Sequence, residues 1–191
     1  MPATAPASAL FLDRDGIVNV DHGYVYRIED FAFVPGIFAL ARAAQAAGRR
    51  LVIVTNQSGI ARGRYGEAEY QRLTAWMQAR FIEAGAPLAG VWHCPHLPGA
   101  PAPYGIDCDC RKPAPGLILA ARDALGLDLA RSILIGDKAR DIESARRAGL
   151  GHAWLVSGER AEIDAAAADD VWPSVAALAA DVRAQAALAF Q

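Results

Sequence analysis

Two aspartates, Asp13 and Asp15, stand one residue apart directly after the apolar run Ala9–Leu12 and before Gly16. This pattern is typical of a buried strand that carries carboxylates at its carboxyl end. Carboxylates at such an edge can hold a divalent cation or attack an electrophilic centre. Aspartate and glycine are also common in solvated turns, so the pair alone leaves a simple turn open.

Two other polar residues also follow short apolar runs. Thr55 comes directly after residues 51–54, and Asp137 comes directly after residues 132–136. The carboxyl ends of parallel strands meet at one edge of a sheet, so we expect Asp13, Thr55 and Asp137 to converge there. This convergence favours the chemical interpretation over the turn.

Further charges lie close to these residues in the sequence. Arg111 and Lys112 offer two cations, and Asp137 and Asp141 are one helical turn apart, so both acids can share a helix face. The alternatives without a chemical role are that Arg111 and Lys112 are solvated surface residues, and that Asp137 is a helix acid favoured only by the helix dipole.

The elements that must position these residues alternate along the chain. We expect a tail over residues 1–8 and an irregular loop or short hairpin over residues 17–33. Strands and helices are expected over the rest of the chain. The predicted strands cover residues 9–13, 51–54, 88–92, 132–136 and 152–156, and the predicted helices cover 35–47, 67–83, 115–125, 139–148 and 175–188. This alternation predicts an α/β fold, with a parallel central sheet covered by helices on both faces.

Composition narrows the class of protein. The chain has 191 residues, 53% of them hydrophobic, and a formal net charge of -2. We therefore expect one domain over residues 1–191. The small negative net charge gives no overall positive potential that would attract nucleic acid. No apolar run approaches the roughly 20 residues that span a bilayer. The first residues lack the features of a signal peptide, so a cytoplasmic protein is expected.

All cysteines lie in a segment rich in proline and glycine, residues 94–110, which we call the zinc loop. Three thiols and an imidazole complete a tetrahedral Zn²⁺ shell with no open position, so the predicted site is structural. The alternative is a set of loop cysteines beside an unrelated histidine. His93 is a further candidate ligand. The four predicted ligands are Cys94, His96, Cys108 and Cys110.

The order of the four stretches, DxD, Thr, Lys and GDxxxD, resembles the haloacid dehalogenase (HAD) superfamily of phosphohydrolases over residues 9–150. The resemblance implies a three-layer Rossmann-like fold and an aspartyl-phosphate intermediate. Asp13 would be the nucleophile, and Asp15 the general acid and base. Lys112 and Thr55 would stabilise the phosphoryl oxygens.

The same resemblance implies a catalytic Mg²⁺. Asp13, the backbone carbonyl of Asp15 and Asp137 would hold it. Asp141 would either orient Lys112 or support the metal. Only about 35 residues separate the first motif from the second predicted strand, which leaves no room for a large cap domain.

The zinc loop resembles two branches of the superfamily, one acting on heptose 1,7-bisphosphates and one on histidinol phosphate. Residues 19–25 and 55–63 resemble the heptose branch, whereas the histidinol branch typically has an acid at the position of Ser58. Ile17 departs from the threonine that is usual there. Arg111 would recognise the non-reacting 1-phosphate. The predicted substrate-binding residues are Asn19, Asp21, His22, Asn56, Gln57, Ser58, Arg111 and Lys138.

The resemblance therefore implies a monomeric Mg²⁺-dependent phosphatase with a structural zinc, which removes the 7-phosphate of a heptose bisphosphate in nucleotide-activated heptose supply for lipopolysaccharide. A histidinol-phosphate or other sugar-phosphate phosphatase is one alternative. A phosphotransferase or mutase of the same superfamily is another. A catalytically silent, zinc-stabilised binding protein is an alternative of a different class.

Overall fold

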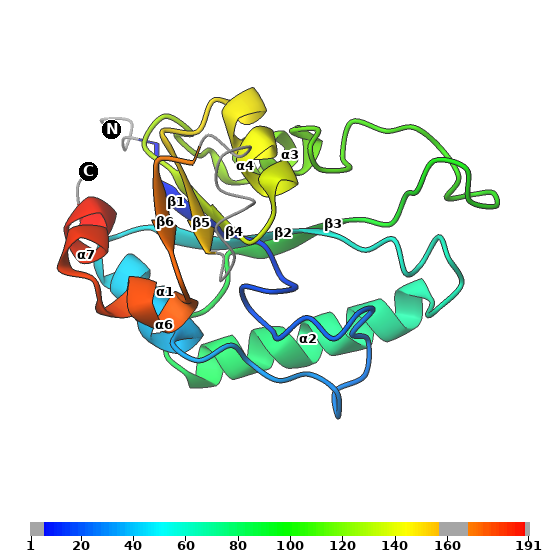
Figure 1. Ribbon diagram of the computed structural model, residues 1–191, viewed down its shortest axis with the longest axis horizontal. Helices are drawn as coiled ribbons and strands as arrows, with labels where there is room; N and C mark the ends of the chain where they lie inside the picture. Colours follow the sequence, from blue (N-terminus) through cyan, green and yellow to red (C-terminus); the bar gives the residue numbers. More distant parts are fainter. Residues whose placement is uncertain (1–5, 157–167, 190–191) are drawn as a thin grey trace, which may run out of the picture.

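The computed structural model of the protein describes residues 6–156 and 168–189 (Figure 1). Six described strands form one sheet in the order β3-β2-β1-β4-β5-β6, and every neighbouring pair is parallel. The parallel α/β fold predicted from the sequence is confirmed. The strands are β1 Ala9–Leu12, β2 Arg50–Asn56, β3 Gly90–Cys94, β4 Ile133–Gly136, β5 His152–Val156 and β6 Asp170–Trp172.

Helices cover both faces of the sheet, as predicted, and make three layers. In Figure 1, α3 and α4 lie on one side of the sheet, and α1, α2 and α6 lie on the other. None of the described helices is long and apolar enough to cross a membrane. The helices are α1 Ile37–Ala46, α2 Glu67–Glu83, α3 Gly116–Leu125, α4 Ala139–Ala148, α6 Val175–Ala180 and α7 Val182–Ala189.

The central strands are buried on both faces, which explains their continuous apolar runs. In β1, Leu10 and Leu12 belong to the core that α1 and α2 cover, whereas Ala9 and Phe11 belong to the core beneath α3 and α4. This alternation is the two-residue period of a strand. Ile17 also lies fully buried in the first core, so its side chain acts in packing.

The prediction of one helix over 175–188 is wrong. The helix breaks at Asp181, whose backbone is extended, and α7 begins immediately after it. The Asp181 carboxylate accepts hydrogen bonds from the backbone N–H groups of Arg183 and Ala184, at 2.7 and 3.4 Å. Asp181 therefore caps a new helix, and capping of this kind starts a second helix within an alanine-rich run.

Smaller differences concern the edges of the fold. The three-residue strand β6 was not predicted, and β3 lies two residues later than the predicted strand. Within the predicted tail, Ala7 bridges to Leu127 and Ser8 is buried, so these two residues are packed. Residues 1–5 lie outside the described part of the chain.

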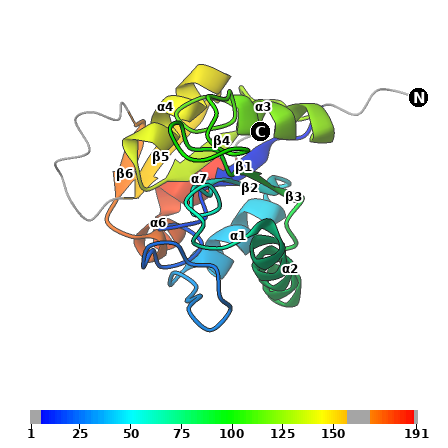
Figure 2. The same ribbon diagram turned by 90° about the vertical axis from the view of Figure 1, so that its right-hand side faces the viewer.

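Three long connections leave the carboxyl ends of the strands. They run from β1 to α1, from β2 to α2, and from β3 through the zinc loop to α3. Figure 2 views the molecule from the side on which these connections project. The first carries isolated bridges, such as that between Asn19 and Phe33, and no helix or strand among its described residues. The carboxyl ends of the strands are therefore covered by loops, and the described residues contain no large cap domain.

Candidate active site

The residues predicted to converge do lie at neighbouring strand ends. β1 is the strand between β2 and β4, so Asp13 after β1 lies between Thr55 near the end of β2 and Asp137 after β4. The backbone N–H of Asp13 donates to the carbonyl of Ile135 at 3.0 Å, which ties it to β4. Asp13 and Thr55 are both buried. The sheet therefore fixes the backbone of all three.

Lys112 is a buried cation between two of the acids. Its Nζ lies 2.9 Å from Asp13 Oδ1 and 2.6 Å from Asp141 Oδ1, and it donates to the carbonyl of Val54 at 2.9 Å. Asn56 holds the backbone of Lys112 by two hydrogen bonds of 3.0 Å. Burial alone would lower the pKa of Lys112, but the charges of Asp13 and Asp141 hold that pKa above its ordinary value. Lys112 is thus a fixed positive charge beside Asp13.

Three carboxylates lie close enough together to hold a metal ion. Ligand oxygens of Asp13, Asp137 and Asp141 all lie within 4.8 Å of one another. Burial and the charge of Asp141 raise the pKa of Asp13 to about 7, although Lys112 opposes the shift. Burial and Asp141 likewise raise the pKa of Asp137 to about 6. A divalent cation would relieve this repulsion.

Gly16 leaves the space that the Asp137 carboxylate occupies. A Cβ atom at Gly16 would lie 2.4 Å from Asp137 Oδ2, and the φ of Gly16 is 95°. A side chain there is excluded by both space and backbone conformation. Asp137 Oδ1 is buried and has no hydrogen-bond partner among the described residues, which leaves an oxygen suited to a cation.

Asp15 lies outside this carboxylate cluster, and its side chain is held by neutral and cationic donors. Arg14 Nη2 and Asn19 Nδ2 donate to Asp15 Oδ1 at 2.9 and 3.1 Å. Gln57 Nε2 lies 2.9 Å from Asp15 Oδ2 and 2.8 Å from Thr55 Oγ1. Gln57 therefore links the acid at the end of β1 with the hydroxyl at the end of β2.

The structure adds two residues to this network that the sequence did not single out. Arg14 is 1% exposed and also donates to the carbonyl of Val25 at 2.8 Å. Tyr65 donates its hydroxyl proton to Gln57 Oε1. The position of Arg14 between Asp13 and Asp15 in the sequence could have indicated its role. Nothing in the sequence indicates that Tyr65 contacts Gln57.

A pocket of about 290 Å³ opens beside Asp15. Four of the predicted substrate-binding residues line it, namely Asp21, Asn56, Gln57 and Ser58. Asp21 also accepts a hydrogen bond from the backbone N–H of Gly23 at 2.9 Å. Arg140, which the sequence did not single out, and Tyr24 complete the pocket wall together with Gly23, Gly59 and Tyr65.

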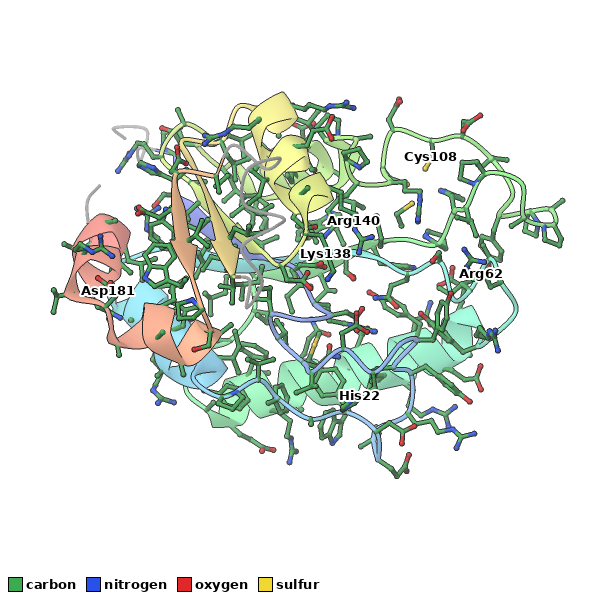
Figure 3. The ribbon with its side chains drawn as sticks, viewed as in Figure 1. His22, Arg62, Cys108, Lys138, Arg140 and Asp181 are labelled. Atoms are coloured by element: carbon green, nitrogen blue, oxygen red, sulfur yellow. The ribbon has the colours of Figure 1, made fainter. Side chains whose placement is uncertain are left out.

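Other predicted substrate residues lie outside the lining of this pocket. His22 is exposed, and Asn19 is buried behind Asp15. Arg111 donates to the carbonyl of His96 at 3.1 Å, and Lys138 Nζ lies 3.3 Å from Asp137 Oδ2. In Figure 3, Lys138 and Arg140 lie beside the strand ends, and Cys108 and Arg62 lie on the loops that project beyond them.

The zinc loop gathers its four predicted ligands into one cluster. The ligand atoms of Cys94, His96, Cys108 and Cys110 lie within 4.8 Å of one another. The sulfur atoms are 3.0 to 3.6 Å apart, somewhat closer than the roughly 3.8 Å edge of a tetrahedron with Zn–S bonds of about 2.3 Å. His93 is not part of the cluster, because its Nε2 lies 3.1 Å from Glu67 Oε2.

The chain resembles known proteins over most of its length. The HAD-hydrolase-like family model matches residues 109–178. D-glycero-beta-D-manno-heptose-1,7-bisphosphate 7-phosphatase of Vibrio cholerae is 49% identical over 78% of this chain and 80% of its own. D-glycero-alpha-D-manno-heptose-1,7-bisphosphate 7-phosphatase of Burkholderia mallei is 48% identical over 85% of this chain and 87% of its own.

A solved structure shows the same fold. The crystal structure of D,D-heptose 1,7-bisphosphate phosphatase from B. bronchiseptica, complexed with magnesium and phosphate, superposes with a TM-score of 0.77 at 32% identity. The match covers 90% of this chain and 96% of that one.

Proposed function

The chain belongs to the family of D-glycero-D-manno-heptose-1,7-bisphosphate 7-phosphatases, and from this premise we propose that it hydrolyses the 7-phosphate of such a bisphosphate. The products are the heptose 1-phosphate and inorganic phosphate. The observation that carries the chemistry is the placement of Lys112 Nζ, 2.9 Å from Asp13 Oδ1 at the end of a central strand.

Asp13 acts as the nucleophile. Its carboxylate oxygen forms a bond to phosphorus as the bond between phosphorus and O7 breaks. Asp15 gives a proton to O7, then takes one from the water that hydrolyses the aspartyl-phosphate. Lys112 and Thr55 stabilise the phosphoryl oxygens, the first as a fixed charge and the second as a hydroxyl donor.

The carboxylate cluster fits a magnesium ion. Asp13 and Asp137 would hold it together with the backbone carbonyl of Asp15, and Asp141 would orient Lys112, in keeping with the 2.6 Å contact. When bound, Mg²⁺ supplies positive charge that lets an anionic nucleophile approach an anionic phosphate.

The cysteine cluster fits a structural zinc ion. Three thiolates and one imidazole fill a tetrahedral shell, so no position is left for a substrate. Cys110 directly precedes Arg111 and Lys112, so a metal at this cluster would preorganise both cations. The zinc loop would then act on catalysis through the position of Lys112.

Substrate selection would fall to the loops around the pocket. Asp21 and Ser58, with Asn56 and Gln57, would contact the sugar, since all four line the pocket beside Asp15. Arg111 would anchor the 1-phosphate, because a bisphosphate needs a second cationic contact. Asn19, His22 and Lys138 complete the proposed set. Asn19 would act through its hydrogen bond to Asp15.

We further propose a single domain that works as a cytoplasmic monomer in heptose activation for lipopolysaccharide. In support, a single chain already gathers both proposed metal-ligand sets and places Lys112 beside Asp13, so the site needs no side chain from a partner. Light scattering coupled to size exclusion should give the mass of one chain, 20.2 kDa. A dimer mass would contradict this part of the proposal.

Phosphate release from a panel of substrates tests the function. The panel holds both anomers of D-glycero-D-manno-heptose 1,7-bisphosphate, fructose 1,6-bisphosphate and histidinol phosphate, each with Mg²⁺. We expect a preference for a heptose bisphosphate of at least about 100-fold in kcat/KM, worth about 2.7 kcal/mol, and loss of that activity in Asp13→Asn. Preference for histidinol phosphate would overturn the substrate assignment. Full activity of Asp13→Asn would overturn the covalent mechanism.

A further inference from the structure

Arg14, which lies between Asp13 and Asp15 in the sequence, is a buried cation that binds the carboxylate of Asp15. Its side chain is 1% exposed. Nη2 donates to Asp15 Oδ1 at 2.9 Å, and Nε lies 3.3 and 3.2 Å from the two carboxylate oxygens. Asp15 is 22% exposed and also lines the pocket. The guanidinium therefore holds this carboxylate from the protein interior, while part of Asp15 stays open to a substrate.

Arg14 is itself fixed by parts of the chain outside β1. Its Nη2 also donates to the carbonyl of Val25, in the connection from β1 to α1, at 2.8 Å. Its guanidinium carbon lies 6.0 Å from the centre of the Tyr70 ring in α2, at the limit of a cation–π contact. The buried Tyr70 ring in turn lies 4.1 Å from the ring of His93 in β3. The guanidinium therefore has a defined orientation before a substrate binds.

The buried charge of Arg14 indicates a role beyond packing. Burial alone would lower the pKa of Arg14, but the charge and hydrogen bonds of Asp15 hold that pKa above its ordinary value. Nη1 is buried and has no hydrogen-bond partner among the described residues. A buried ion pair adds little stability compared with well-packed apolar side chains of similar volume. An incompletely paired buried cation is therefore better explained by the carboxylate that it orients.

We infer that Arg14 is a positioning residue that orients Asp15 toward the leaving oxygen of the substrate, an inference that rests on the proposed function. In the first step the proton of Asp15 moves to O7 as the bond between phosphorus and O7 breaks. Asp15 is left as a carboxylate, which the charge and hydrogen bonds of Arg14 stabilise. Arg14 acts through Asp15, so its effect depends on how much the leaving group needs that proton.

Leaving groups of different basicity separate this role from a structural one. The alkoxide O7 of a sugar is a strong base and needs the proton, whereas p-nitrophenolate is a weak base and leaves without it. A packing defect, or a changed path of the connection from β1 to α1, would slow both substrates equally. Both substrates use the same nucleophile and the same cation, Asp13 and Lys112.

The variant Arg14→Met tests the inference, because methionine fills apolar space and cannot donate a hydrogen bond. Release of the leaving group is measured in a single turnover, with enzyme in excess and Mg²⁺ present. We expect Arg14→Met to slow the release of heptose 1-phosphate from the bisphosphate at least about 100-fold, and the release of p-nitrophenolate from p-nitrophenyl phosphate at most about threefold. Equal slowing of the two substrates would overturn the inference.

Two further variants serve as rescue and control. Arg14→Lys keeps the charge without the planar fork and should recover part of the rate with the bisphosphate. A rate no higher than that of Arg14→Met would overturn the role of the charge. Arg80→Met should change neither rate, because Arg80 also lies over an aromatic ring of α2 and pairs with a carboxylate, but on the exposed surface. If Arg14→Met does not fold, the two substrates are compared in Arg14→Lys, where equal slowing has the same meaning.

A series of aryl phosphates distinguishes failure of the inference from failure of the proposed function. A wild type that cleaves aryl phosphates but no heptose bisphosphate would overturn the proposed substrate alone. Across the series, the rate should fall more steeply with leaving-group basicity in Arg14→Met than in the wild type. The same slope in both proteins would overturn the inference, whichever sugar is accepted. Absence of release from every ester would overturn both.

Discussion

The two halves of the candidate active site differ in how they are held. The strand-end cluster consists of Asp13, Lys112, Asp137 and Asp141. The side chains of Lys112 and Asp141 are 0% exposed, and that of Asp137 is 14% exposed. The loop pocket, in contrast, presents exposed side chains such as Tyr24, which is 42% exposed. Charge pairs act strongly only where water is excluded. We therefore expect the cluster to govern the chemical step and the stability of the fold, and the pocket to govern substrate affinity.

The largest expected effect comes from removing the buried cation. Lys112→Met would leave Asp13 and Asp141 buried without their partner, which costs about 3–5 kcal/mol of unfolding free energy. The phosphoryl group would lose a fixed charge, so kcat should fall roughly 10³-fold. Urea denaturation and phosphate-release kinetics measure the two effects.

A second variant shows whether the uncompensated charge is the cause. Adding Asp141→Asn to Lys112→Met removes one of the orphaned carboxylates, so the double variant should recover part of the lost stability. Arg147→Met serves as the control, because its pair with Glu143 is half exposed and worth at most about 1 kcal/mol. A double variant less stable than Lys112→Met would contradict the proposed charge balance.

The zinc loop leads directly into the strand-end cluster, so its loss should affect stability and the chemical step. Cys108→Ser should remove bound zinc and lower the Tm by about 5–10 °C, which corresponds to roughly 2–3 kcal/mol in a chain of this size. It should also lower kcat about tenfold, because Lys112 lies two residues beyond Cys110. Asp107→Asn, an exposed change on the same loop, is the matched control. Wild-type protein that contains no zinc after purification without chelators would refute the site.

The contrast between the halves also explains what the sequence predicts well. A polar residue after an apolar run marks a strand end, so the placement of Asp13, Thr55 and Asp137 follows from the pattern. The link from Tyr65 through Gln57 to Asp15 does not, because it depends on the path of an irregular loop. The break at Asp181 was missed for another reason, since alanine-rich residues on both sides favour helix and only the cap separates them.

The network around Asp15 lies between the two halves and should give an intermediate effect. Gln57→Leu removes a donor to Asp15 and to Thr55, so kcat should fall about 10–100-fold as the general acid loses its orientation. Tyr65→Phe removes only the outer hydrogen bond to Gln57 and should cost about threefold. A loss in Gln57→Leu no larger than that in Tyr65→Phe would contradict the role of Gln57 in holding Asp15, because leucine fills a similar volume without the donor.

The smallest expected effect belongs to the pocket wall. Arg140 is exposed at the start of α4 and lines the pocket together with Asp21. A solvent-exposed contact to an anionic substrate is worth about 1 kcal/mol, so Arg140→Ala should raise KM roughly fivefold. The contact would be equally strong in the ground state and the transition state, so kcat should stay unchanged. Arg147→Ala on the same helix, outside the pocket lining, should change neither constant. A fall in kcat for Arg140→Ala would contradict the proposal that the strand-end cluster governs the chemical step and the pocket governs substrate affinity. An exposed cation of the pocket wall would then act on the chemical step, as Lys112 does.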